Sequence, residues 1–285
     1  MNGLLLIAAL VVGTWNGNWF PSGRAEHRAH PAVEEATITA AANMLADGLR
    51  RIDPAGTNDV ILCLHEMRGP TAASNLIARI GRRDLRLAVI SGYRRRDRFD
   101  MQQDAIATTL PLDETRWALW PRPRHLIPPR GYAFAAVRVA SNVTVNVYAV
   151  HLKSNYGATR PELVVGNRDK RTAAIEHLVM LEQPQDGRGR CPVIIAGDMN
   201  TDNARKAFQD EPLFGILSAA GFADPLSGLP PARRCTYPSK RYGDSAFDRV
   251  FCRGLRSVAE PQIIPSEGLS DHRALFVLLD FPSSP

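Results

Sequence analysis

Short apolar segments that lead directly into a polar residue recur along the whole chain of 285 residues. Asn16 follows LLLIAALVVGTW, Glu66 follows VILCLH, His151 follows VTVNVYAV, and Asp198 follows PVIIAG. Apolar runs of this kind, bounded by turn residues, indicate buried strands. Because neighbouring strands of a packed sheet end close to one another, we expect these polar side chains to converge on one cleft.

The same pattern predicts strands and helices that alternate to the end of the chain. Residues 31–52 place apolar side chains at helical spacing, with acidic residues near the start and arginines near the end, an order that suits the helix dipole. Two β-rich runs separated only by residues 141–142 predict a hairpin. We predict strands over residues 4–12, 59–64, 85–91, 132–140, 143–152, 192–196, 247–252, 261–264 and 274–279, helices over 31–52, 71–80, 160–181 and 213–220, and a loop over 111–129. The chain is therefore interpreted as one α/β domain, residues 1–285, in which helices cover antiparallel sheet.

The composition excludes several classes of protein. With 45% apolar and 22% charged residues, the chain is neither disordered, nor collagen-like, nor a coiled coil. Its net charge is +6, and of the 35 basic residues only four are lysine and 31 are arginine. Two explanations of the arginine excess stay open: recognition of phosphate by planar guanidinium groups, or the codon bias of a GC-rich genome.

The amino-terminal apolar run and the cysteines leave the cellular compartment open. Residues 4–12 are too short to span a bilayer and are interpreted as the first strand rather than a cleaved secretory signal, although a leader upstream of this start is an alternative. None of the four cysteines has zinc-site spacing, and Cys191 and Cys235 could form a disulfide. A cytoplasmic and a secreted location are both compatible with this sequence.

The residue types at the predicted strand ends suit hydrolysis of a phosphate ester. Carboxylates hold hard divalent cations, amides orient a cation or a phosphate, and imidazoles move protons. The carboxylates are Glu66, Asp198 and Asp271, the amides are Asn16, Asn18 and Asn200, and the imidazoles are His151 and His272.

The order of the polar motifs resembles a known family. TWNGN, LHE, VHLKSN, AGDMNTD, FDRVF and SDHRAL follow one another between residues 14 and 279, nearly the whole chain. This succession is similar to that of the endonuclease/exonuclease/phosphatase superfamily, also called DNase I-like. The resemblance implies a four-layer α/β/β/α sandwich, in which two packed, mainly antiparallel sheets are flanked by helices.

The resemblance also implies metal ligands and substrate contacts. Glu66 is similar to the principal ligand of Mg²⁺ or Mn²⁺ in the family, supported by Asn16 and Asp271. Substrate contacts are expected from Asn18, Arg130, Lys153 and Ser154.

Five further roles are catalytic. Asp198 and Asn200 resemble the pair that orients the attacking water and contacts the scissile phosphate. His272 resembles the catalytic histidine, and Asp248 matches the acid that orients it and fixes its tautomer. His151 would stabilise the pentacovalent phosphate or protonate the leaving group, but no counterpart of the acid that orients a second histidine is found.

Together these features predict a divalent-metal-dependent phosphodiester hydrolase. We expect a nuclease that cleaves DNA or RNA, since the charge is positive, arginines cluster at residues 93–98, and Trp117 and Trp120 could stack on bases. Within the family that the chain resembles, abasic-site endonucleases carry a tyrosine-type segment where this chain has His151, and inositol phosphatases carry GDLNYR where it has GDMNTD, so the resemblance disfavours both activities. The alternatives are a sphingomyelinase-like phosphodiesterase or phosphatase for a small or lipid phosphate, and a catalytically silent binding module. We expect a monomer without a transmembrane segment.

Overall fold

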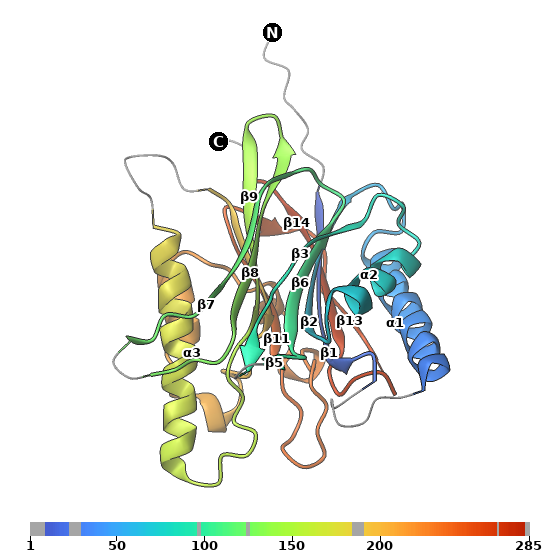
Figure 1. Cartoon of the computed structure of the whole chain (residues 1–285). Coiled ribbons are helices and arrows are strands. Elements are labelled where there is room, and N and C mark those ends of the chain that lie inside the picture. Colours follow the sequence, from blue (N-terminus) through green and yellow to red (C-terminus); the bar gives the residue numbers. More distant parts are fainter. Residues whose placement is uncertain are drawn as a thin grey trace.

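Two β-sheets packed face to face form the middle of the molecule, and helices cover both outer faces (Figure 1). This computed structural model describes residues 9–22, 30–95, 98–123, 126–183, 191–266 and 268–282. The four-layer arrangement predicted from the motif order is confirmed.

The larger sheet has seven strands in the order β12-β14-β1-β2-β6-β3, and β13 also pairs with β14. Only β1 and β2 run parallel; the other pairs are antiparallel. The strands are β1 (Leu10–Phe20), β2 (Asp59–Met67), β3 (Arg86–Ile90), β6 (Gln103–Thr108), β12 (Arg256–Ser257), β13 (Gln262–Ile264) and β14 (Ala274–Asp280).

The smaller sheet has five strands in the order β11-β10-β9-β8-β7. Again one pair, β9 and β10, is parallel. The strands are β7 (Leu112–Leu119), β8 (Gly131–Ala140), β9 (Val143–His151), β10 (Val193–Asp198) and β11 (Asp248–Arg253). Two short strands, β4 (Arg94–Arg95) and β5 (Arg98–Phe99), pair with each other.

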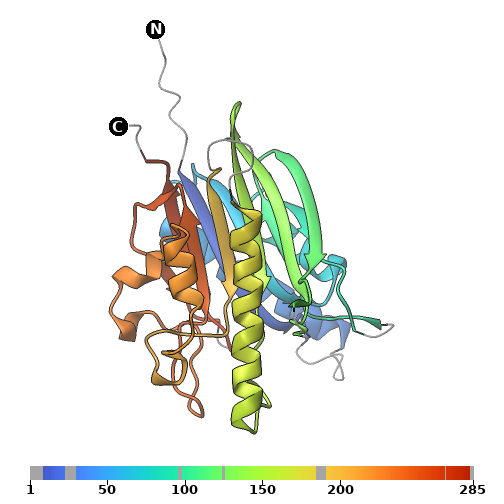
Figure 2. The ribbon, with the colours of Figure 1, turned by 90° about the vertical axis from the view of Figure 1, so that its left-hand side faces the viewer.

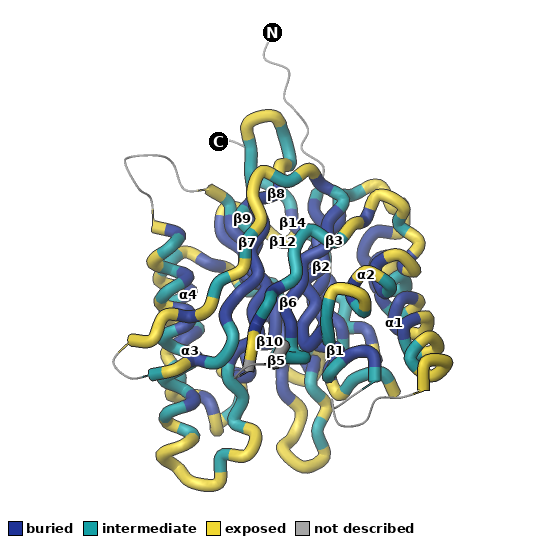
Figure 3. Tube along the Cα trace, in the orientation of Figure 1, coloured by how far each residue is buried: buried dark blue, intermediate teal, exposed yellow. Residues whose placement is uncertain are grey.

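Alternating side chains of each strand separate the molecule into three apolar cores. Leu10 and Val12 of β1 point between the sheets, whereas Val11 packs beneath α1 (Pro31–Ile52) and α2 (Pro70–Arg79). On the other side, α3 (Pro161–Leu181) and α4 (Leu213–Ala219) cover the five-stranded sheet. The central strands are therefore buried on both faces, whereas the outer surfaces of the helices and the edge strand β7 are exposed (Figure 3). Short 3₁₀ turns η2 (Lys206–Phe208), η3 (Pro225–Gly228) and η4 (Pro231–Arg233) lie in the connections.

Helix α1 shows how local signals set an element. Pro31 occupies its first turn with Glu34, where a missing amide proton costs nothing and a negative charge faces the positive helix end. Arg50 and Arg51 lie in its last turn. The bounds predicted for this helix are confirmed, and so is the hairpin that turns at residues 141–142, although its strands begin and end at residues 131 and 151 instead of 132 and 152.

Two predictions about elements are wrong. The loop predicted over residues 111–129 contains β7, an edge strand whose outer residues Asp113, Glu114 and Thr115 are charged or polar because only β8 pairs with it. The first strand extends through Phe20, beyond residue 12, because Asn16 still pairs with His65 of β2; residues 4–8 lie outside the described residues. No element was predicted for β6, whose first residues Gln103 and Asp104 are polar yet buried.

All four cysteines are free thiols, with Cys191 exposed and Cys235 buried. None of the helices in the described part of the chain combines the length and apolarity that a bilayer crossing requires.

Strand direction brings the polar motifs to one end. The parallel pairs β1–β2 and β9–β10 all finish there, and β11 begins there, so the strand ends opposite the two chain termini carry the polar residues (Figure 1).

Candidate functional site

Strand register sets three predicted catalytic residues side by side. Asp198, the last residue of β10, pairs with His151 on β9 and with Asp248 on β11. Side chains of directly paired residues share one face of a sheet. All three are buried, so this end of the five-stranded sheet is a dense cluster of titratable groups.

Asn16 connects this cluster to the other sheet. Its amide Nδ2 donates to Oε1 of Glu66 at 3.3 Å and to Oδ2 of Asp198 at 3.0 Å, and its Oδ1 accepts the backbone N–H of Asn18 at 3.0 Å. One buried amide therefore holds a carboxylate of each sheet, which places Glu66 and Asp198 in the same site.

His272 lies between two carboxylates. Its Nδ1 is 2.8 Å from Oδ2 of Asp248, and its Nε2 is 3.7 Å from Oδ2 of Asp198. Burial by itself lowers the pKa of His272, but the charges of Asp248, Asp198 and then Asp271 outweigh it and raise the pKa to about 10. At neutral pH His272 is therefore an imidazolium.

His151 has the opposite character. Its Nε2 is 3.6 Å from Oδ2 of Asp198 and 3.8 Å from Oε1 of Glu66, while its Nδ1 is buried without a hydrogen-bond partner. Burial, reinforced by the charge of Arg130, lowers the pKa of His151 well below its usual value. The sequence showed no acid that would orient His151, and in the structure its Nδ1 indeed has no carboxylate partner. With its pKa lowered, the ring is neutral at pH 7.

Asp198 is held by the turn that follows it. Its Oδ1 accepts the backbone N–H of Asn200 at 2.8 Å, and Nδ2 of Asn200 donates to the carbonyl of Leu152 at 3.1 Å. Burial raises the pKa of Asp198, although the neighbouring His272 opposes the rise. A carboxylate with a raised pKa is a stronger base, which suits proton abstraction from water.

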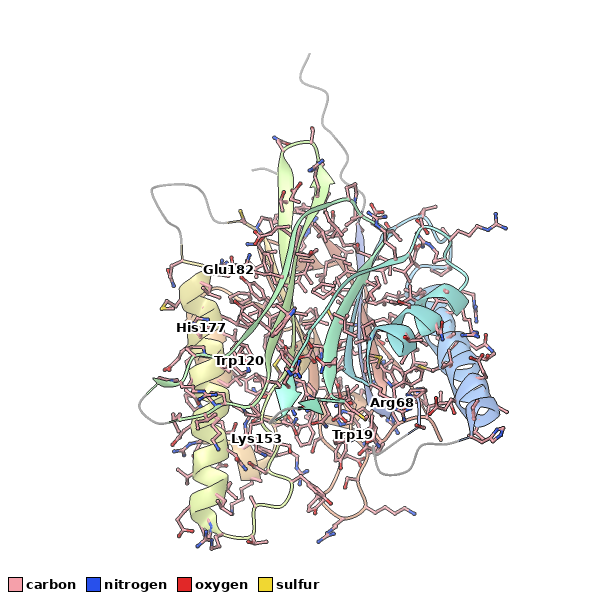
Figure 4. All side chains as sticks on the ribbon, viewed as in Figure 1. Trp19, Arg68, Trp120, Lys153, His177 and Glu182 are labelled. Carbon is pink, nitrogen blue, oxygen red and sulfur yellow. The ribbon has the colours of Figure 1, made fainter. Side chains whose placement is uncertain are left out.

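Backbone strain gathers at the same end of the sheets. Among the described residues, five that are not glycine have φ values in the left-handed region, and a bulky side chain is rarely found there. Such conformations cost about 1–3 kcal/mol each and are typical of functional sites. They are Asn18, Trp19, Glu66, Arg130 and Asn200, of which Trp19 is labelled in Figure 4.

The predicted substrate contacts lie in loops beside the cluster and, for Asn18, near the end of β1. Arg130 turns inward: Nε and Nη2 donate to the carbonyl of His151, Nη2 also reaches the carbonyl of Leu152, and Nη1 donates to Gln102. Three nitrogens thus have protein acceptors, so Arg130 positions the end of β9. Its contact with substrate stays a prediction.

Lys153 is partly buried at the lower end of the molecule in Figure 4, and its Nζ donates to the carbonyl of Ser154 at 2.6 Å. Burial and the charges of Arg130, Lys170 and Arg171 lower the pKa of Lys153 to about 8. Cations gathered in this way favour a bound anion.

Asn18 and Asp271 lie at the margin of the cluster. Asn18 is half-buried and adjoins Asn16, and Asp271 is exposed and acts on His272 through its charge. Within the described ranges, no group of three or more His, Cys, Asp and Glu side chains is arranged as a metal cage. The metal-ligand roles of Asn16, Glu66 and Asp271 stay predictions.

Sequence reasoning missed Tyr237. Its ring centroid lies 4.9 Å from that of His272, and it stacks on Phe247 at 5.2 Å. Nothing in the local pattern marks this tyrosine, because only the tertiary structure brings its loop against the histidine. Trp120, one of the two tryptophans that could stack on bases or pack in the core, is packed: it is buried beside His177 under α3 (Figure 4).

Comparison of the sequence with models of protein families and with curated proteins gave no match. Comparison of the structure gave many. An endonuclease/exonuclease/phosphatase from Beutenbergia cavernae is 16% identical in sequence, with a TM-score of 0.65. The superposition covers 98% of this chain and 73% of the Beutenbergia chain.

Two similar structures were solved with DNA. The 3′ phosphatase NExo from Neisseria, bound to a product DNA hairpin, is 15% identical with a TM-score of 0.60, covering 96% of this chain and 99% of its own. TDP2 from D. rerio, complexed with a single strand DNA product, is 15% identical with a TM-score of 0.59, covering 95% and 99%. At these identities the likeness concerns the fold. The chain has the fold of the endonuclease/exonuclease/phosphatase, or DNase I-like, proteins.

Proposed function

We propose that this protein is a divalent-metal-dependent phosphodiester hydrolase and that its substrate is nucleic acid. The observation that carries the proposal is the convergence on one carboxylate oxygen: Oδ2 of Asp198 lies 3.7 Å from Nε2 of His272 and 3.6 Å from Nε2 of His151. A base flanked by a charged and a neutral imidazole supports in-line attack of water on phosphorus.

Glu66 fits a metal ligand. Its Oε1 accepts from Asn16, but its Oε2 is buried without a hydrogen-bond partner, which is costly unless a cation or water completes it. Mg²⁺ binds through one or two carboxylates and keeps several waters, so it does not need a cage of three side chains. Glu66 would hold Mg²⁺ or Mn²⁺, with Asp271 as the proposed second carboxylate. The bound ion would polarise a phosphoryl oxygen and stabilise charge on the leaving oxygen.

The chain's own groups have distinct tasks in this proposal. Asp198 accepts the proton of the attacking water, and Asn200 keeps that carboxylate oriented through its backbone N–H. His272, charged and fixed by Asp248, donates from Nε2 to a phosphoryl oxygen. His151 is neutral, so its Nε2–H stabilises the pentacovalent phosphate by a hydrogen bond, in preference to protonating the leaving group.

The groups beside the cluster support an anionic substrate. Lys153 is repelled by neighbouring cations, which help to lower its pKa, and the negative charge of a bound phosphate would offset this repulsion. Ser154, in the loop after β9, and Asn18, near the end of β1, are half-buried and would contact flanking phosphates. The positive net charge and the DNA products bound in the NExo and TDP2 structures support nucleic acid over a small ester.

One assay tests this function. Purified protein is incubated with supercoiled plasmid, RNA, bis-p-nitrophenyl phosphate and p-nitrophenyl phosphate, each with Mg²⁺, with Mn²⁺ and with EDTA. We expect metal-dependent cleavage of nucleic acid and turnover of the diester. Diester turnover without nucleic acid cleavage would favour a small or lipid phosphate, and no turnover of any substrate would favour a binding module.

Variants assign the activity to this site. His272→Ala, confirmed as folded by circular dichroism, should lose roughly 10²- to 10⁴-fold in rate. Glu176→Gln, an exposed position on α3, is the matched control and should keep wild-type activity. Near wild-type activity of the His272 variant would contradict the mechanism. The single domain and the monomeric state also stay predictions, and size-exclusion chromatography tests the latter.

A further inference from the structure

Three strongly exposed aromatic side chains lie at the end of the five-stranded sheet that carries the site. In the described part of the chain, Tyr156 is 68% exposed, Tyr242 is 50% exposed and Trp117 is 42% exposed. Trp117 lies near the end of β7, Tyr156 follows β9, and Tyr242 precedes β11. Large exposed rings collected at one end indicate a binding surface.

The segments that carry the three rings follow the order of the strands. Trp117 lies on β7, one edge of the sheet, Tyr156 lies in the loop after the central strand β9, and Tyr242 lies in the loop before β11, the other edge. Because neighbouring strands lie about 4.8 Å apart, the line from β7 to β11 is about 19 Å long. His151 and Asp198 end the strands within this line.

Two of the rings are supported by the protein, which limits the entropy lost on binding. Trp117 lies over Gly92, where a Cβ would come within 2.9 Å of the indole, and it meets Tyr93 edge-on at 5.9 Å. Tyr242 has the guanidinium of Arg241 over its ring at 5.1 Å.

The loop that carries Tyr242 extends beyond the sheet. Residues 237–245 close on themselves through paired backbone hydrogen bonds between Tyr237 and Ser245, and the loop projects from the site end in both views (Figures 1 and 2, orange). Its tip residues Lys240, Arg241 and Tyr242 are exposed, and its stem residue Tyr237 contacts His272. The loop that carries Tyr242 is therefore anchored beside His272 at its stem.

Cations accompany the rings. Lys240 and Arg241 precede Tyr242, and the exposed Arg160 follows Tyr156 in the loop that leads to α3. Basic side chains beside aromatic faces are the means by which proteins hold unpaired nucleic acid strands, because every unpaired base offers a face for stacking. A lipid surface is a poorer fit, since the loop tip, Ser-Lys-Arg-Tyr-Gly, has no bulky aliphatic residue to insert.

We propose that an unpaired nucleic acid strand lies across the end of the five-stranded sheet and stacks its bases on Trp117, Tyr156 and Tyr242. The inference rests on the proposed function and adds to it the form of the substrate. In a duplex the base faces are already stacked, so this surface favours single strands. The scissile phosphate would lie between the rings, beside His151 and Asp198.

Binding is measured in EDTA, so that no cleavage occurs, by fluorescence anisotropy of a labelled oligonucleotide in single-stranded and duplex form. We expect the single strand to bind at least about tenfold more tightly. Stacking is worth about 1–3 kcal/mol per base, so Tyr242→Ala or Trp117→Ala should weaken single-strand binding about 5- to 150-fold. Tyr242→Phe and Trp117→Phe, which keep a ring, should restore most of the affinity.

Matched variants separate stacking from charge and from folding. Met180→Ala removes a 59% exposed apolar side chain at the far end of α3 and should bind like wild type. Lys240→Ala/Arg241→Ala should reduce the slope of log K against log salt by about 1.4, since each phosphate contact in a single strand contributes about 0.7. Arg50→Ala/Arg51→Ala removes two exposed charges from the opposite end of the molecule and should leave the slope unchanged.

The outcomes are distinct. If wild-type protein cleaves nucleic acid but binds duplex as tightly as single strands, or if the alanine variants bind like wild type, this inference is overturned and the proposed function stands. If wild-type protein neither binds nor cleaves any nucleic acid, the proposed function fails first. Sedimentation with phosphatidylglycerol vesicles that is lost in Tyr242→Ala, with oligonucleotide binding unaffected, would show an anionic lipid surface instead.

Discussion

Asp248 fixes the orientation of His272: its Oδ2 lies 2.8 Å from Nδ1 of the ring, and both groups are buried. This contact leaves Nε2 directed toward Asp198. Because Asp248 and Asp198 raise the pKa of His272 to about 10, the ring is charged throughout the neutral range.

Asp248→Asn should therefore lower the pKa of His272 and the rate together. The amide is nearly the same size but carries no charge, so we expect the His272 resonance in a two-dimensional NMR titration to shift its midpoint toward its usual value. Catalysis should fall about 10²- to 10⁴-fold. Asp280→Asn, on the opposite end of β14, serves as the control. An unchanged His272 midpoint would refute the assigned contact.

His272 also makes stability depend on pH. Its folded pKa is raised above the unfolded value near 6.5, so its contribution is fully present below pH 6.5 and is lost as the pH rises toward about 10. The difference in unfolding free energy between wild type and His272→Gln, from urea titrations, should thus shrink steadily between pH 7 and pH 10. A difference that does not vary with pH over this window would show that the ring is neutral.

Lys153 predicts the pH dependence of substrate binding. Its folded pKa of about 8 means that the ammonium is charged at pH 7 and loses its proton above pH 8. KM for a diester should then rise about tenfold per pH unit above pH 8, and Lys153→Met should have a raised KM without that slope. Lys206→Met, an exposed lysine on η2, should retain the slope.

Glu66 predicts a metal-dependent stability. A ligand that binds only the folded state stabilises it by about 2.7 kcal/mol at 100 times its Kd, which for a chain of this size raises Tm by several degrees. We expect Mg²⁺ to raise the Tm of wild type but not that of Glu66→Gln in differential scanning calorimetry. Equal shifts in both proteins would place the ion elsewhere.

The position of Gly197, beneath the site, has no room for a larger side chain. It has φ +150°, and a Cβ there would lie 1.9 Å from the carbonyl oxygen of Val150 and 2.8 Å from Cε1 of His65. Gly197→Ala should destabilise the fold by about 1–3 kcal/mol or more, because the backbone of β9 cannot move aside. Gly215→Ala, inside α4 with open space around it, should instead stabilise by about 0.5–1 kcal/mol. Urea unfolding of both variants measures the two signs.

Much of the site was predictable because its residues follow apolar runs. Asn16, Glu66, His151 and Asp198 occur where such a run stops, and they meet because β1–β2 and β9–β10 are parallel pairs that run toward the same end of the two sheets. The local sequence pattern was also enough to predict α1, from the spacing of its apolar residues, and the β8–β9 hairpin, from the two-residue turn between two β-rich runs.

The failures have a common cause. β6 begins with Gln103 and Asp104, which read as polar, and their burial is possible only because distant groups satisfy them: Ser91 and Tyr93 from the turn after β3, and His65 of β2. β7 is an edge strand, so its charged residues resemble a loop. Hydrophobic periodicity reports what a segment buries on average, and it does not report partners that are far away in the chain.

The sequence by itself determined the fold and the residue types of the site, because both follow from the pattern of apolar residues and from the order of the motifs along the chain. Only the tertiary structure decided what each group does. It placed Asp248 behind His272, left His151 without an acid, turned Arg130 toward the carbonyl of His151, and set Tyr237 against the ring of His272. Charge states and orientations depend on neighbours brought together by packing, and for that reason they emerge only when the sheets are assembled.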